Sequence, residues 1–340
     1  MRALVCHAYG PIETLKVEEV SLPEPKAGEV LIRVGAAGVS FAALLGVQGK
    51  HQNKPPLPYV PGNELAGHIV KLGSGVTHLT VGQRVMTGVS QGAYAEYAVA
   101  IAANVLPIPE TMPYAQATNF PTLYPTAYGA LRWKADLQLG EVLLVHGAGG
   151  GSGLTAIEVG KAMGASVIAS AGGSDKLVAA RDAGADHLID YRKEDLRSRV
   201  LDITGGRGAD VIYDPVGGSA FDVSLRCVAP EGRLIPMGFA SGTVPQIPAN
   251  ILLVKNLTVI GFYYGYYNGW GGRGEPSSKE LTALAKRRAM VAEAQAELMR
   301  WFTEDKLKAT IAGTFDLANW TQGFRLIEDR TVVGKAVLVP

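Results

Sequence analysis

The most informative segment of the chain is Val145-His146-Gly147-Ala148-Gly149-Gly150-Gly151-Ser152-Gly153. It follows a continuous apolar run at 141–146, typical of a buried parallel strand, and precedes residues 154–163, which have helical composition. A strand-to-helix turn that receives a dinucleotide pyrophosphate must be tight, must let the phosphates approach the backbone, and must bring helix and strand together. Residues without a Cβ atom permit all three. The segment therefore predicts a phosphate-binding turn, where unpaired N–H groups and the helix dipole attract an anion.

The glycines of this turn follow the spacing G-x-x-G-G-x-G, with Gly147, Gly150, Gly151 and Gly153 at the fixed positions. The stricter G-x-G-x-x-G pattern does not fit, because Ser152 stands where its last glycine would fall. A glycine cluster alone is a weak signal, since a flexible loop has the same composition. Its place between a predicted strand and a predicted helix is what favours dinucleotide binding.

An alternation of strands and helices continues beyond the turn. Further apolar runs lie at 166–170, 187–190, 209–214, 232–237 and 259–262. Strands and helices that alternate at this spacing indicate βαβ units and a doubly wound parallel sheet. We therefore predict an α/β fold class with a Rossmann domain over residues 122–265.

The chain before residue 121 has a different pattern, with short apolar runs separated by turn signals such as Gly73-Ser74-Gly75. This pattern indicates a β-rich, barrel-like domain. Residues 266–340 contain a long helical stretch and a final strand. We assign them to the first domain, because the nucleotide-binding sheet is already complete without them.

Length, charge and cysteine content exclude several classes of protein. The chain has 340 residues, and a prior of about 150 residues per domain suggests two domains. The formal net charge is +1, whereas proteins that bind nucleic acid or anionic membranes usually carry a basic excess. No signal-peptide pattern and no apolar run of about 18 residues is present, so we expect no membrane span. Cys6 and Cys227 are far apart in sequence, which favours buried free thiols and a cytoplasmic location.

The residues after the second predicted strand bear on the choice of nicotinamide cofactor. NAD enzymes place an acid there, about 20 residues past the glycines, to bind the adenosine ribose. Here the strand runs into residues 169–174, which contain no carboxylate, and Lys176 follows. An ammonium can bind the 2′-phosphate of NADPH. We interpret Asp175 as a first-turn helix residue with Ser174 as its N-cap, and we predict NADPH as the cofactor.

Several motifs outside the glycine turn identify a family. They are Pro61-Gly62-Asn63-Glu64-Leu65-Ala66-Gly67, Gly82-Gln83-Arg84-Val85, Gly92-Ala93-Tyr94-Ala95-Glu96-Tyr97, Asp190-Tyr191-Arg192 and Gly334-Lys335. With them the chain resembles, over essentially its whole length, the zinc-independent medium-chain dehydrogenases/reductases, specifically the quinone oxidoreductase branch that includes zeta-crystallin. The resemblance implies a GroES-like catalytic domain over 1–121 and 266–340, interrupted by an NADP-binding Rossmann domain over 122–265. It also implies a homodimer, formed through an edge strand at 256–260.

The resemblance implies cofactor-binding roles for further residues. Those near the adenosine end are Gly172, Lys176, Tyr191 and, towards the C-terminus, Arg330. Lys335 is a further candidate for cofactor binding. Those near the nicotinamide are Thr126, Gly238 and Phe239.

A catalytic zinc is not expected. Zinc-dependent relatives have a cysteine ligand where this chain has Ser40 and a histidine ligand where it has Asn63. His51, His68 and His78 lack ligand-type spacing and supporting cysteines. We therefore predict an enzyme without a metal.

Without a Lewis acid, the predicted reaction is hydride transfer from NADPH to a quinone or to the β-carbon of an α,β-unsaturated carbonyl. Many relatives carry Asn-Phe-x-Asp where this chain has Ser40-Phe41-Ala42-Ala43, so no family proton donor is present, and His51 is a substitute that we consider. The candidate catalytic residues are Ser40, Thr126 and Tyr263. The aromatic run at 262–270 is either a substrate wall or a packed interface.

Two alternative functions stay open. The first is an enoyl-thioester reductase, for which Arg273 with Lys286-Arg287-Arg288 would offer a basic groove to coenzyme A. The second is a low-turnover NADPH-binding protein, used structurally or for RNA binding. The near-neutral charge argues against RNA as a partner, so we expect a small-molecule substrate.

Overall fold

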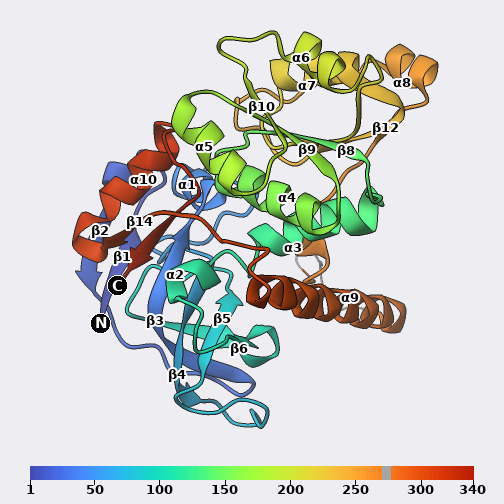
Figure 1. Cartoon of the computed structure of the whole chain (residues 1–340). Helices are drawn as coiled ribbons and strands as arrows, with labels where there is room; N and C mark the ends of the chain where they lie inside the picture. Colours follow the sequence, from blue (N-terminus) through green and yellow to red (C-terminus); the bar gives the residue numbers. More distant parts are fainter. Residues whose placement is uncertain (270–276) are drawn as a thin grey trace. The chain divides into compact units, whose positions relative to one another are not determined.

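The structure is a computed structural model that describes residues 1–269 and 277–340 (Figure 1). The chain forms two units, one made of Met1–Thr122 with Ala309–Pro340 and the other of Leu123–Lys308. Trp270 and Arg273, which belong to the predicted aromatic run and basic groove, lie outside the described residues. Within the described ranges, no helix combines the length and apolar character that a bilayer crossing needs.

The first unit is rich in β-structure. A seven-stranded sheet has the order β14-β15-β3-β4-β5-β7, with β6 paired to β3, and a two-stranded sheet joins β1 to β2. The strands are β1 (Arg2–Cys6), β2 (Leu15–Glu19), β3 (Glu29–Val39), β4 (Glu64–Leu72), β5 (Arg84–Gly88), β6 (Tyr97–Ile101), β7 (Leu106–Pro107), β14 (Ile311–Asp316) and β15 (Lys335–Val339). The helices are α1 (Phe41–Val47), α2 (Tyr114–Ala117) and α10 (Trp320–Glu328).

The two sequence segments of this unit share one core. The last strand, β15, lies antiparallel to β3, with Val337 opposite Gly38. The ring of Phe324 in α10 meets the edge of the buried Tyr94 ring at 5.8 Å between centroids. The chain therefore has to return after residue 308 to complete the sheet that its first residues begin.

The second unit is a doubly wound parallel sheet of six strands, in the order β10-β9-β8-β11-β12-β13. The strands are β8 (Val142–His146), β9 (Ser166–Ala171), β10 (His187–Asp190), β11 (Ala209–Asp214), β12 (Val228–Pro236) and β13 (Thr258–Val259). The helices are α3 (Leu123–Tyr128), α4 (Gly151–Ala162), α5 (Ser174–Asp182), α6 (Leu196–Ile203), α7 (Ser219–Cys227), α8 (Ala249–Lys255) and α9 (Ser278–Thr303). Helices α4 and α5 cover one face of the sheet and α6, α7 and α8 cover the other (Figure 1). The predicted α/β fold class is confirmed.

Strand order in this sheet reverses at β8, which is followed along the chain by β9 on one side and has β11 on its other side. In open parallel sheets, the carboxyl ends of the strands at such a reversal form the usual ligand site. His146 ends β8 and Asp214 ends β11, so both lie at this edge. The sheet topology therefore selects the same turn that the glycine spacing selected.

The second unit extends beyond the range 122–265 that the sequence predicted, because it includes α9. Trp301 near the end of α9 is buried, and its ring lies 5.7 Å from that of Tyr128 in α3. An amphipathic helix is placed by the surface that its apolar face covers. For α9 that surface belongs to the second unit.

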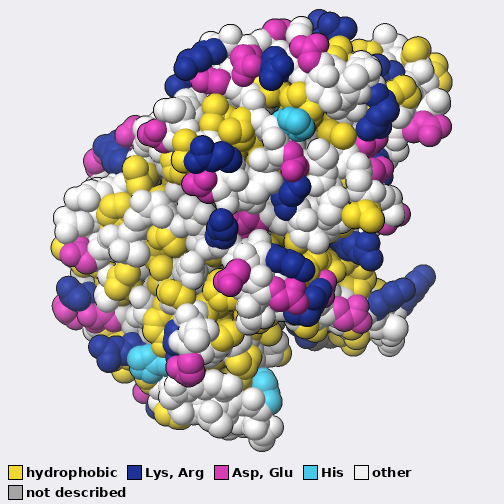
Figure 2. Space-filling view, viewed as in Figure 1, with side chains coloured by type: hydrophobic (Ala, Val, Ile, Leu, Met, Phe, Trp, Pro, Cys, Tyr) yellow, Lys and Arg dark blue, Asp and Glu magenta, His cyan; other side chains and the backbone are white. Residues whose placement is uncertain are grey.

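Charged side chains of both signs are interspersed over the face of the molecule shown in Figure 2. That face therefore offers no continuous basic surface, in keeping with the net charge of +1.

Candidate cofactor site

The glycine turn joins β8 to α4 as predicted. Gly147 has φ +58°, a left-handed conformation that glycine adopts without strain. A Cβ atom on Gly153 would lie 2.3 Å from the carbonyl oxygen of Gly147, so only glycine lets α4 pack this closely on the turn. Gly150 is the N-cap of α4 and no side chain caps it, which leaves helix N–H groups for an anion.

Two side chains lie against Gly172, the residue that directly follows β9. A Cβ atom on Gly172 would lie 2.6 Å from Nε of Arg192 and 2.8 Å from the hydroxyl oxygen of Tyr191. Burial lowers the pKa of Lys176, and the nearby Arg192 guanidinium lowers it further. Lys176 packs over Gly149 of the glycine turn. A Cβ atom added to Gly149 would lie 2.5 Å from the Cβ atom of Lys176. The predicted residues Gly172, Lys176 and Tyr191 therefore lie together, beside the phosphate-binding turn.

Arg192 is a member of this group that the sequence analysis did not assign. The motif Asp190-Tyr191-Arg192 contains this arginine, but in a sequence a single arginine after a strand cannot be told from an ordinary surface arginine. Its backbone N–H donates to Oδ1 of Asp190 at 3.1 Å, which holds the residue where its side chain covers Gly172.

The predicted cap of α5 is wrong. Its N-cap is Gly173, at φ +101°, and Ser174 is already the first helical residue. Glycine is needed here because the backbone adopts a positive φ that a serine would not. Asp175 lies in the first turn, as predicted, where its carboxylate favours the helix dipole.

The residues predicted to lie near the nicotinamide are on two elements of the second unit. Thr126 is half-buried in α3. Gly238 and Phe239 follow β12, and the Phe239 side chain is 42% exposed.

His146 and Asp214 form a buried polar pair at the switch point. Ser224 donates its hydroxyl hydrogen to the carbonyl of Ala220 at 2.8 Å, so the 2.8 Å contact with Nε2 of His146 has the imidazole as donor. Burial lowers the pKa of His146, although the nearby Asp214 carboxylate opposes that shift. His146 is therefore neutral at pH 7.

In the first unit, Ser40 serves as the N-cap of α1. Its Oγ accepts from the backbone N–H of Ala43 at 3.1 Å and lies 3.5 Å from Oδ1 of Asn63. These are the two positions at which zinc-dependent relatives carry ligands. Among the described residues, no group of three or more His, Cys, Asp or Glu side chains is placed to hold a metal ion. The chemistry available at Ser40 is therefore hydrogen bonding.

The predicted cofactor residue Lys335 lies in the interior of the first unit. It is 3% exposed, and its ammonium contacts the carboxylate of Glu64, which is 1% exposed. Arg330 belongs to the same unit and is exposed after the end of α10.

The aromatic run divides into inward and outward rings. Tyr264 and Tyr267 are buried, and the Tyr267 ring lies 4.8 Å from that of Trp133. Tyr263 and Tyr266 are exposed, and the guanidinium of Arg287 lies 4.1 Å from the centre of the Tyr266 ring. Tyr264 and Tyr267 are thus internal packing, and Arg287 of the predicted basic groove stacks on an aromatic ring.

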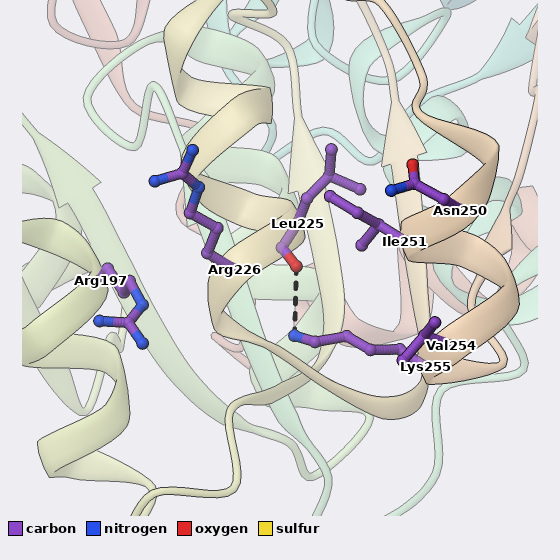
Figure 3. Close-up of a pocket in the computed structure, with 7 residues that line it drawn as sticks. All are labelled: Arg197, Leu225, Arg226, Asn250, Ile251, Val254 and Lys255. Carbon is purple, nitrogen blue, oxygen red and sulfur yellow. Dashed lines mark hydrogen bonds between the residues drawn. The ribbon is translucent and has the colours of Figure 1, made fainter.

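A surface pocket of about 470 Å³ lies elsewhere in the second unit, between α6, α7 and α8 (Figure 3). It is lined by Arg197, Leu225, Arg226, Asn250, Ile251, Val254 and Lys255. Lys255 donates to the carbonyls of Leu225 and Val228, at 3.2 and 3.1 Å, and so satisfies the end of α7. None of the predicted site residues lines this pocket.

Comparison with known proteins places the chain in a family. Residues 26–110 match the "Alcohol dehydrogenase GroES-like domain" and residues 151–274 match the "Zinc-binding dehydrogenase" family. The chain is 36% identical over 340 residues to quinone oxidoreductase-like protein 2 homolog of Nematostella vectensis. This match covers 99% of the present chain and 88% of the relative. It is 30% identical to quinone oxidoreductase 1 of Escherichia coli, with 98% of each chain covered.

Solved structures give the same assignment. The Escherichia coli quinone oxidoreductase complexed with NADPH superposes with a TM-score of 0.88, at 30% identity, and covers 100% of both chains. A probable oxidoreductase from Mycobacterium abscessus superposes with a TM-score of 0.86, at 32% identity, covering 100% of this chain and 99% of that one. The chain belongs to the quinone oxidoreductase family of the medium-chain dehydrogenases/reductases.

Proposed function

We propose that this protein is an NADPH-dependent reductase that transfers hydride, without zinc, to a quinone or to the β-carbon of an α,β-unsaturated carbonyl. The observation that carries the proposal is that Tyr191 and Arg192 lie against Gly172, while Lys176, near Arg192, packs on Gly149 of the glycine turn. This group lies where an adenosine ribose meets a Rossmann sheet, and no carboxylate ends β9. The Escherichia coli relative, whose structure holds NADPH, supports the same cofactor.

The charge at this position separates the two nicotinamide cofactors. A 2′-phosphate carries negative charge and several acceptor oxygens, which an ammonium, a guanidinium and a phenol can all bind. NADH presents a neutral hydroxyl there instead. The Arg192 guanidinium lies close enough to Lys176 to lower its pKa, in addition to the larger effect of burial. A 2′-phosphate would interact favourably with both cations, so this group favours NADPH over NADH.

The remaining groups suit the rest of such a cofactor. Gly147, Gly150, Gly151 and Gly153 would hold the pyrophosphate at the N-terminus of α4. Thr126, Gly238 and Phe239 would surround the nicotinamide, which supplies the hydride when bound. We propose the first unit as the catalytic domain, since Ser40 lies there.

The acceptor oxygen gains negative charge as hydride arrives, and hydrogen-bond donors stabilise it. Ser40, Thr126 and Tyr263 are the candidate donors. Ser40 is held in a fixed position by its contacts with Ala43 and Asn63, which suits a residue that orients a carbonyl. Tyr263 is 47% exposed, so its hydroxyl is accessible.

The cofactor proposal is tested by Lys176→Ala, Arg192→Ala and the double variant. Each should raise the KM for NADPH by about 10-fold or more, since a charge-assisted hydrogen bond contributes about 1.5–3 kcal/mol. The KM for NADH should change little. Lys193→Ala is the matched control, because that lysine has a side chain 79% exposed and lies next to Arg192 in sequence. Equal losses for NADH and NADPH would refute the proposal.

The substrate proposal is tested by NADPH oxidation with a panel of quinones, enones and enoyl-CoA esters. Turnover with quinones or simple enones supports the proposal. A strong preference for enoyl-CoA esters would indicate an enoyl-thioester reductase. NADPH binding without turnover on any of them would indicate a low-turnover binding protein.

We also propose a homodimer through the edge strand β13, which has a partner on one side only in this chain. Leu253 and Val254, on the neighbouring α8, are 79% and 80% exposed, which is unusual for side chains of this size. Sedimentation should give a dimer for the wild type and a monomer for Leu253→Asp/Val254→Asp. The cytoplasmic location stays a prediction.

A further inference from the structure

The carboxylate of Asp214 is buried at the switch point, and it forms no ion pair with a cation among residues 1–269 and 277–340. It is 1% exposed, and its neighbour His146 is held neutral by burial. A buried carboxylate without an ion pair is expensive, so its hydrogen bonds need an account.

Both hydrogen bonds of this carboxylate go to the turn that follows it, residues 214–218. Oδ1 accepts from the backbone N–H of Val216 at 2.8 Å and from that of Gly217 at 3.0 Å. Gly217 and Gly218 have φ values of +69° and +55°, which most residues avoid. A side-chain oxygen that accepts from two N–H groups holds such a turn in one conformation.

The 214–218 turn in turn supports the loop at 238–243. The backbone N–H of Ala240 donates to the carbonyl of Pro215 at 3.1 Å, and that of Ser241 donates to the carbonyl of Val216 at 2.9 Å. Gly218 completes the set, since its N–H donates to the carbonyl of Thr243 at 3.1 Å. The two segments are therefore one hydrogen-bonded assembly.

This assembly also touches the glycine turn. A Cβ atom on Gly147 would lie 3.2 Å from Val216 and 3.3 Å from Pro215, so the two turns are in close contact at the carboxyl edge of the sheet. The assembly carries Gly238 and Phe239 at one end and borders the phosphate-binding turn at the other. It is thus placed to set the position of a nicotinamide relative to its own pyrophosphate.

We infer that Asp214 is a positioning residue for hydride transfer, which acts through the 214–218 turn and the 238–243 loop. Its role is to accept two hydrogen bonds from the backbone of that turn. The inference rests on the proposed function, because it assumes that a nicotinamide lies at this loop.

Asp214→Ala removes the acceptor. Misplacement of a reacting group by about 1 Å costs on the order of 100-fold in rate, so kcat should fall by about that factor. The KM for NADPH should change by less than about threefold, because the adenosine end is bound by Lys176 and Arg192. Asp214→Asn keeps an oxygen in the Oδ1 position and should retain kcat within about threefold of the wild type. Asp222→Ala, which removes an exposed carboxylate from α7, is the matched control.

Amide hydrogen exchange gives a readout that needs no turnover. In Asp214→Ala, exchange at Ala240 and Ser241 should become faster, while amides of β8 and β9 keep their wild-type rates. Should Asp214→Ala fail to fold, Asp214→Ser replaces it, since a serine hydroxyl accepts from the same turn more weakly. Its kcat should fall between those of the wild type and a variant without an acceptor.

The outcomes separate this inference from the proposed function. A wild type that does not oxidise NADPH contradicts the proposed function, and the exchange rates then still test the link from Asp214 to the loop. Any one of three results would overturn the inference. They are a wild-type kcat in Asp214→Ala, a kcat for Asp214→Asn as low as that of Asp214→Ala, and unchanged amide exchange in the 238–243 loop of Asp214→Ala.

Discussion

Lys335→Met is the substitution whose effect the structure predicts most sharply. The Lys335 ammonium and the Glu64 carboxylate contact each other in the interior of the first unit, with residue exposures of 3% and 1%. Methionine has a similar length and volume but no charge. The substitution leaves the Glu64 carboxylate buried without its partner, which costs about 3–5 kcal/mol.

Within the part of the chain that the structure describes, Lys335 is the cation with which Glu64 forms an ion pair. Tyr94 is fully buried beside it, and its pKa is raised by burial and, secondarily, by the Glu64 charge, so the phenol stays neutral. The Tyr94 hydroxyl donates to the carbonyl of Gly38 at 3.1 Å rather than to Glu64. Glu64→Met/Lys335→Met replaces both charges by apolar side chains, and a replaced buried pair is often neutral or stabilising. We expect the free energy of unfolding of this double variant to lie within about 2 kcal/mol of the wild-type value.

The assay is urea unfolding of the wild type, both single variants and the double variant, followed by far-ultraviolet circular dichroism. The free energies of unfolding close a double-mutant cycle. Two results would refute the reasoning. One is a free energy of unfolding for Lys335→Met within about 1 kcal/mol of the wild-type value, and the other is a double variant that is as unstable as the single variants. Unchanged stability with a raised KM for NADPH would instead support the cofactor role that the sequence predicted for Lys335.

Other predictions concern the second unit. Gly153→Ala should destabilise the protein by about 1–3 kcal/mol, because the new Cβ atom would collide with the backbone of Gly147. In Gly150→Ala the new Cβ atom meets no atom closer than 3.6 Å. This variant should keep the wild-type melting temperature while binding NADPH more weakly. The pKa of His146 is lowered in the folded state, so the unfolded state binds more protons below about pH 6.5. As the pH decreases below that value, the free energy of unfolding should fall by up to about 1.4 kcal/mol per pH unit. His146→Asn should flatten that pH dependence, whereas His187→Asn, which removes an exposed ring, should leave it as in the wild type. A wild-type pH dependence in His146→Asn would contradict the assignment.

The sequence was sufficient for the parts of the structure that depend on local spacing. The glycine turn and the alternating strands predicted the parallel sheet, because most of its strands contain an apolar run and helices lie between them in sequence. Gly172, Lys176 and Tyr191 are grouped through the family resemblance, and in the structure they follow the adjacent strands β9 and β10.

Features that depend on distant partners could not be predicted in this way. A lysine such as Lys335 is usually exposed, and its partner Glu64 is 271 positions away along the chain. The aromatic run has a composition that fits a binding wall and a core equally well, and only the packing of Tyr267 on Trp133 separates inward from outward rings. The pattern of α9 identifies a helix, but the surface that it covers is set by Tyr128 and its neighbours.

The return of the chain to its first sheet has a bearing on synthesis. The strands β8 to β13 are contiguous, so the parallel sheet can be completed as soon as residue 259 leaves the ribosome. By contrast, β3 and β4 emerge long before β15, and Glu64 has to wait for Lys335 before its charge can be buried with a partner. The parallel sheet can therefore be completed while the sheet of the first unit still lacks both β14 and β15.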